Sequence, residues 1–166
     1  MTNIKVGFSK PKKWKPFSWL IMKGYGTPYS HSYIKFRSNT YDCNLIYQAS
    51  HSLVNFTAES VFEDENEVIK EFDLDISDET RINMIKFAIN NSGKPYGIKE
   101  VFGLAIVRIC EIFGKKIKNP FGFKNFVCSM LVAFILEECL KLDIPGEFQE
   151  STPKILYDYM LSLAIK

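Results

Sequence analysis

The sequence predicts an α+β fold, and three observations support this class. The first half of the chain contains short segments in which apolar and polar residues alternate, as they do along half-buried strands. Helix start and stop signals bracket residues 77–93, and residues 128–140 are apolar almost all round, as in a helix buried in a core. The 166 residues are expected to form a single domain, residues 1–166.

Five segments have the composition of strands, and the last of them follows an expected acidic turn at residues 63–67. These strands are residues 4–8, 29–37, 44–49, 53–56 and 67–74.

The second and third of these segments are expected to form a hairpin with its turn at residues 39–40. In its first strand Ile34 and Phe36 share one face, and His31 lies on the opposite face. A turn centred between residues 39 and 40 places His31 opposite Gln48.

Helices are predicted at residues 17–24, 77–93, 128–140 and 154–164. In the second of them, Ser77 or Asp78 can cap the first turn, and Gly93 ends the helix.

The segment 98–124 is an insertion of uncertain role. Its apolar part, residues 101–113, is about 13 residues long, whereas a membrane span needs roughly 20, so no transmembrane segment is expected. We interpret it as a core or lid helix. The alternative is a helix that lies on a membrane surface, since three lysines follow it directly.

Composition constrains the compartment and the cofactors. No apolar run follows the first residues as in a secretory signal, so a cytoplasmic location is expected, with peripheral membrane contact as an open possibility. Cys43, Cys110, Cys128 and Cys139 form no C-x-x-C pair and have no histidine at zinc-finger spacing. We expect reduced thiols, no metal site and no cofactor.

A basic cluster near the N-terminus could contact an anionic surface, although the net charge of the chain is only +2. The candidates for the partner are a phospholipid surface and nucleic acid. The cluster is short, so a solvated surface is the favoured interpretation, and no nucleic-acid recognition motif accompanies it. Its members are Lys10, Lys12, Lys13 and Lys15.

Cys128 is the candidate nucleophile because it opens the apolar helix at residues 128–140. At a helix N-terminus the macrodipole and the unpaired backbone N–H groups favour a thiolate, and the same N–H groups can hold an oxyanion. A helical cysteine is by itself more often an inert core residue. Cys139, in the middle of the same helix, is the example of that ordinary role.

A thiol nucleophile needs a base, and the chain offers only His31 and His51. His31 is preferred because it lies in a predicted strand, whereas His51 lies in a turn. Gln48 is the candidate third group, since its amide carbonyl can accept the Nδ1–H of His31. A glutamine that merely points to solvent is the alternative.

Four short motifs follow one another along the chain. They are Tyr29-Ser-His-Ser-Tyr-Ile-Lys-Phe36, Ile46-Tyr-Gln-Ala-Ser50, Gly93-Lys-Pro-Tyr96 and Phe126-Val-Cys-Ser129. In sequence and in order they resemble the motifs of the permuted papain-like amidases and peptidases, the YiiX-like branch of the NlpC superfamily, in which histidine precedes cysteine.

The resemblance implies a circularly permuted papain-like (NlpC-type) fold, with an antiparallel sheet packed against a central helix that carries Cys128. It also implies that Tyr96 helps to build the cleft or contacts the oxyanion, together with the helix start at Ser129. The sequence departs from the family pattern at Gln48, where glutamate is usual, and at Met130 and Gly97.

The resulting hypothesis is a thiol-dependent hydrolase that cleaves a peptide or peptidoglycan-type amide bond through Cys128, His31 and Gln48. Two alternatives remain open at this point. One is a lipid acyl hydrolase or acyltransferase at a membrane surface, and the other is a catalytically silent papain-like domain that binds a protein partner.

Overall fold

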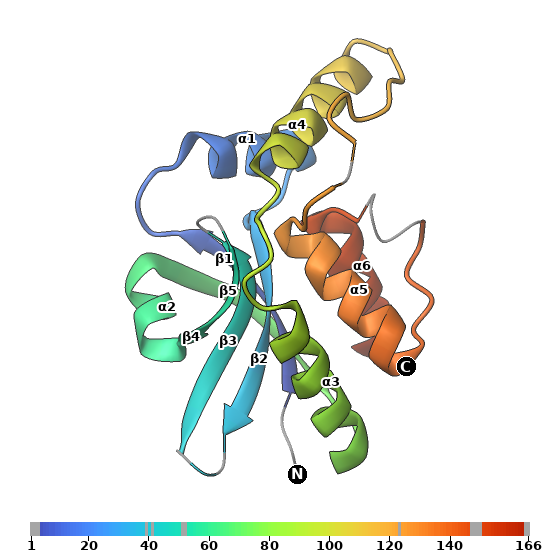
Figure 1. Ribbon diagram of the computed structural model, residues 1–166. Helices are drawn as coiled ribbons and strands as arrows, with labels where there is room; N and C mark the ends of the chain where they lie inside the picture. The colour runs from blue at the N-terminus through green and yellow to red at the C-terminus, as the bar shows by residue number, and fades with distance from the viewer. Residues whose placement is uncertain are drawn as a thin grey trace.

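The computed structural model describes residues 4–38, 40, 42–50, 53–122, 124–146 and 151–164. Over these residues the protein is an α+β structure with a five-stranded antiparallel sheet and six helices, so the predicted fold class is confirmed (Figure 1). The strand order is β4-β3-β2-β1-β5. The strands are β1 (Ile4–Pro11), β2 (His31–Ser38), β3 (Cys43–Ser50), β4 (Leu53–Ala58) and β5 (Asn66–Leu74).

The helices include all those expected and one that the sequence did not indicate. They are α1 (Pro16–Tyr25), α2 (Glu59–Glu65), α3 (Asp78–Asn91), α4 (Ile98–Ile112), α5 (Cys128–Leu140) and α6 (Pro153–Ala164). The expected acidic turn at residues 63–67 is wrong, because its first residues complete α2. Only Phe62 of α2 is buried, so a single anchor leaves no helical periodicity to detect.

The β2–β3 hairpin has a different register from the one expected. Ile34 pairs with Tyr47, whereas a turn centred between residues 39 and 40 would pair Ile34 with Leu45. The connection is longer, and Asp42 within it has a positive φ of 48°. Because the shift is two residues, every side chain keeps its predicted face.

Helices cover both faces of the sheet, and the main core lies between the sheet and α5. Ile34 and Phe36 of β2 pack there with Leu131 and Ile135 of α5, and side chains of α3 and α6 complete this layer. On the other face Phe62 of α2 packs on Tyr33 and Ile46 in a smaller cluster. Figure 1 shows α2 on one side of the sheet and α3, α5 and α6 on the other.

A glycine in β1 allows the smaller cluster to form. Gly7 pairs with Tyr33, and a Cβ atom on Gly7 would lie 2.1 Å from the Tyr33 ring, so only glycine permits this approach. The Tyr33 hydroxyl donates to Glu71 at 2.9 Å, and Lys35 bridges Glu71 and Glu59 at 2.5 and 2.6 Å. This polar network ties α2 and β5 to the centre of the sheet.

The cap of α3 forms as the sequence predicts. Ser77 accepts the backbone N–H of Thr80 at 3.1 Å, and Asp78 lies in the first turn, where its charge complements the macrodipole.

None of the helices in the described part of the chain is long and apolar enough to cross a bilayer.

Truncation of the α5 core contact should destabilise the protein strongly. Ile135 is fully buried in α5, so Ile135→Ala should lower the free energy of unfolding by about 2–5 kcal/mol. The same substitution at Ile89, which is 59% exposed in α3, should change it by less than about 0.5 kcal/mol. Urea unfolding followed by circular dichroism measures both, and equal losses would contradict this assignment of the core.

Candidate active site

The site lies where β2 and β3 separate. In the described chain the pairing between β2 and β3 runs from Ser38↔Cys43 to Ile34↔Tyr47 and stops before His31. The pairing between β3 and β4 continues as far as Ser50. Helix α5 begins with Cys128 at this opening, and a pocket there is lined by both strands. The chain therefore brings residues 31, 48 and 128 together at one end of the sheet.

Cys128 takes its environment from the start of α5. The N-cap residue is Val127, whose side chain cannot accept a hydrogen bond. The backbone N–H groups in the first turn of α5 are therefore not capped by a side chain at this position. The sulfur instead receives backbone hydrogen bonds from Ser129 and from Ser32 of β2. Only 5% of Cys128 is exposed, as expected for a reacting group at the floor of a cleft.

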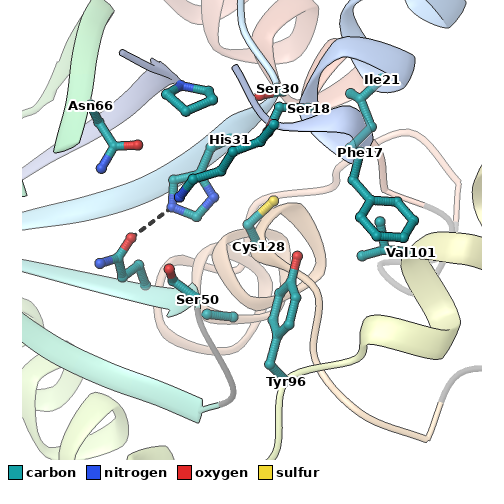
Figure 2. Close-up of a pocket in the computed structure, with 14 residues that line it drawn as sticks. Phe17, Ser18, Ile21, Ser30, His31, Ser50, Asn66, Tyr96, Val101 and Cys128 are labelled. Atoms are coloured by element: carbon teal, nitrogen blue, oxygen red, sulfur yellow. Dashed lines mark hydrogen bonds between the residues drawn. The ribbon is translucent and has the colours of Figure 1, made fainter. Parts of the chain in front are cut away.

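His31 lies between the sulfur and Gln48. Its Nε2 is 2.8 Å from Oε1 of Gln48, the bond drawn as a dashed line in Figure 2. The ring also hydrogen-bonds Cys128. Since an amide oxygen only accepts, Nε2–H is the donor and Nδ1 faces the thiol. The predicted pairing of His31 with Gln48 is found, but through Nε2 rather than the expected Nδ1. In the shifted register Gln48 reaches the ring as a diagonal neighbour.

A second layer of polar groups orients the Gln48 amide. Its Nε2 donates to the Thr57 hydroxyl at 3.5 Å, and that hydroxyl donates to Asn55 at 3.0 Å. Both partners lie on β4, and Asn55 pairs with Gln48 in the sheet. The donor side of the amide is thereby directed toward β4, which leaves its oxygen directed toward His31.

Cys128 and His31 shift each other's pKa toward the charged pair. Burial raises the pKa of Cys128, but the charge and hydrogen bond of His31 and the backbone hydrogen bonds of Ser32 and Ser129 bring the pKa below its ordinary value. Burial likewise lowers the pKa of His31, and the adjacent thiolate with the hydrogen bonds of Cys128 and Gln48 raises it overall. Both shifts favour the thiolate–imidazolium form of the pair over the neutral form.

Tyr96 approaches the sulfur from the opposite side. It lies in an extended segment that bridges to Phe126 just before α5, and Figure 2 shows its hydroxyl directed toward Cys128. Burial and the thiolate charge both raise the pKa of Tyr96, so the hydroxyl keeps its proton. The next residue, Gly97, leaves room for the Glu100 carboxylate, which a Cβ atom would meet at 2.9 Å.

Ser129 contributes its backbone and not its side chain. The Ser129 hydroxyl is buried and donates to the carbonyl of Ser151 at 2.6 Å, which joins α5 to the segment before α6. Its backbone N–H remains the group that faces the sulfur.

A cavity of about 220 Å³ leads to these groups. Phe17 and Ile21 of α1 and Val101 of α4 make an apolar wall opposite the sheet, as Figure 2 shows. Ser30, Asn66 and Lys15 add polar groups near the imidazole, and the Lys15 charge acts against the rise in the His31 pKa.

Sequence reasoning missed most of this lining. Ser32 acts through its backbone N–H, which hydrogen-bonds the Cys128 sulfur. The Ser30-His31-Ser32 run draws attention to its side chain, but no sequence pattern indicates a contact made by the backbone. The wall from α1 and α4 depends on packing between segments far apart in the chain. His51, the less favoured base, lies outside the described residues.

The other cysteines are free thiols, and the expected absence of a metal site and of a cofactor remains a prediction. Cys43, Cys110 and Cys139 are half-buried and unbridged. Among the described residues no three His, Cys, Asp or Glu side chains gather as metal ligands.

No model of a known protein family matches this chain, and no curated protein matches it.

The pKa shift of Cys128 should be visible in its alkylation rate. A lowered pKa keeps Cys128 as a thiolate below the ordinary thiol range, so iodoacetamide labelling should stay fast as the pH falls toward 6. The control is Cys139, whose pKa is raised by burial and by Glu138, and whose labelling should collapse over the same interval. Peptide mass spectrometry measures each rate, and parallel profiles would contradict the ion pair.

Proposed function

We propose that this protein is a thiol-dependent acyl hydrolase with a circularly permuted papain-like arrangement, and that it cleaves an amide bond through an acyl-enzyme. The observation that carries the proposal is the contact of His31 with both Cys128 and Gln48, with the pKa of the thiol lowered and that of the imidazole raised. The histidine strand precedes the cysteine helix along the chain, which agrees with a permuted order.

In the first step the Cys128 thiolate attacks the substrate carbonyl, and a bond forms between sulfur and carbon. The carbonyl oxygen becomes an oxyanion close to the backbone N–H groups of Ser32 and Ser129 and to the Tyr96 hydroxyl. The His31 imidazolium then gives its Nδ1 proton to the leaving nitrogen. The carbon–nitrogen bond breaks, which leaves a thioester on Cys128 and a neutral imidazole.

In the second step neutral His31 accepts a proton from water, and the resulting hydroxide attacks the thioester carbonyl. The carbon–sulfur bond breaks, the acid product leaves, and the thiolate and imidazolium are restored. Gln48 holds the ring in one orientation throughout, because its carbonyl accepts Nε2–H at 2.8 Å in both protonation states of Nδ1.

An activated ester should trap the acyl-enzyme without knowledge of the natural substrate. The protein should release a stoichiometric burst of p-nitrophenol from p-nitrophenyl acetate and carry the acetyl group on Cys128. Cys128→Ser should abolish the burst, and His31→Ala should slow it by roughly 100-fold, because without the imidazole the pKa of Cys128 returns to or above the ordinary thiol range and little thiolate remains at neutral pH. The matched control is Cys139→Ser, which should retain the burst. Acetyl groups spread over several cysteines would refute the proposed nucleophile.

The charge on residue 48 should set the highest pH at which acylation remains fast. Gln48→Glu places a carboxylate beside Nε2, which stabilises the imidazolium and raises the pKa of His31 further. Because activity is lost as the pH rises through that pKa, the alkaline limb of acylation should move to higher pH. Gln48→Ala should move the limb to lower pH and slow acylation about tenfold. An unchanged limb in both variants would remove Gln48 from the site.

A further inference from the structure

Helix α1 is an apolar helix that the core does not use. Six of its ten residues are large apolar side chains, yet none of the ten is buried. Its main packing partner is α4, and the two lie side by side at one end of the molecule, away from the α5 core (Figure 1). An apolar helix left this exposed is typical of an interaction surface.

Helix α4 and the loop after it extend the same surface. Among the α4 residues whose side chains the structure describes, only Glu100 and Gly103 are buried, and the core or lid interpretation of this helix remains a prediction. Phe102 packs edge-on against Phe17 of α1, with centroids 6.3 Å apart, and against Phe121 at 6.1 Å. The surface continues outward to Trp14 and Phe113, which are 73% and 77% exposed.

Positive charge surrounds these apolar side chains. The described residues of segments 12–25 and 98–124, here called the α1–α4 surface, contain nine lysines but only two of the 19 acidic residues. One of the two, Glu100, is buried and accepts backbone N–H groups of Lys124 and Asn125. All nine lysines are exposed. Lys10 of the expected basic cluster lies outside this surface, because it pairs with Glu67 at 3.1 Å.

We propose that the α1–α4 surface docks on an anionic phospholipid bilayer. Exposed tryptophan and phenylalanine side chains partition into the headgroup region, and lysines around them pair with lipid phosphates. Each lysine near an anionic membrane contributes about 1 kcal/mol. The aromatic side chains and the lysines thus act at the same contact.

Two other partners fit this surface less well. A second copy of the chain would bring another nine lysines against the first, so like charges would oppose a dimer through this face. A nucleic acid would neutralise the lysines but would leave the exposed Ile98 and Ile117 in water, because it offers no apolar region for them.

Docking in this way would place the cleft at the membrane. Phe17 belongs both to the exposed surface and to the wall of the cavity, and Val101 of α4 lines the same cavity. A consequence, which rests on the proposed thiol hydrolase, is that the acyl group delivered to Cys128 is one carried by a lipid-anchored molecule.

Vesicle binding by Cys128→Ala tests the docking independently of catalysis. The full chain should sediment with phosphatidylcholine vesicles that contain phosphatidylglycerol, and much less with pure phosphatidylcholine. The only two tryptophans, Trp14 and Trp19, both lie on this surface, so their fluorescence should shift to shorter wavelength on binding. Absence of binding to the anionic vesicles overturns the proposal.

Two variants and a control assign the binding to this surface. Lys115→Glu with Lys116→Glu should weaken binding by at least about tenfold, since two favourable charges become unfavourable. Phe113→Ser should also weaken it, whereas Lys86→Glu on α3, equally exposed, should have little effect. Equal weakening by Lys86→Glu, or tighter binding to RNA than to vesicles, refutes a specific membrane face. When the same three changes are made in the protein that keeps Cys128, acylation of Cys128 by p-nitrophenyl acetate should be unaffected.

Discussion

The contact between Cys128 and His31 is the interaction on which the rest of the site depends. A charged pair with so little exposure would be costly in an apolar core, because burial disfavours both charged forms. Backbone N–H groups from a strand and from a helix lower the pKa of Cys128 and so favour its thiolate, and the Gln48 carbonyl accepts a hydrogen bond from the His31 ring. The local divergence of β2 and β3 makes this possible, because it frees the Ser32 backbone for the sulfur and admits the start of α5.

The neutral third group has a mechanistic meaning of its own. Gln48 orients the ring through a bond of ordinary length, and its own amide is directed by Thr57 and Asn55, so orientation does not need a charge. A carboxylate in this position would add electrostatic stabilisation of the imidazolium and raise its pKa further. Gln48 therefore orients the His31 ring without adding a negative charge. The charge of Cys128 is then the main factor that raises the pKa of His31.

The two ends of the molecule serve different purposes. The sheet and α5 form a conventional core in which eight of the 13 α5 residues are buried. Helix α1 has no buried residue, the described apolar side chains of α4 are partly or fully exposed, and both helices contribute to one wall of the cleft. The exposed aromatic and basic region is therefore continuous, through Phe17, with the side chains that line the cavity leading to Cys128.

The sequence by itself determined the α+β class, the strands and helices with strong periodicity, and the candidate residues Cys128, His31 and Gln48, because these depend on local patterns and residue chemistry. It missed α2, which has one buried anchor, and it misplaced the hairpin register by two residues, because turn length is not encoded in alternation. Only the tertiary structure decided which nitrogen of His31 faces the thiol, that Ser129 acts through its backbone, and that α1 and α4 form the wall of the cleft. Those features arise from contacts between residues far apart in the chain, and the local sequence cannot specify them.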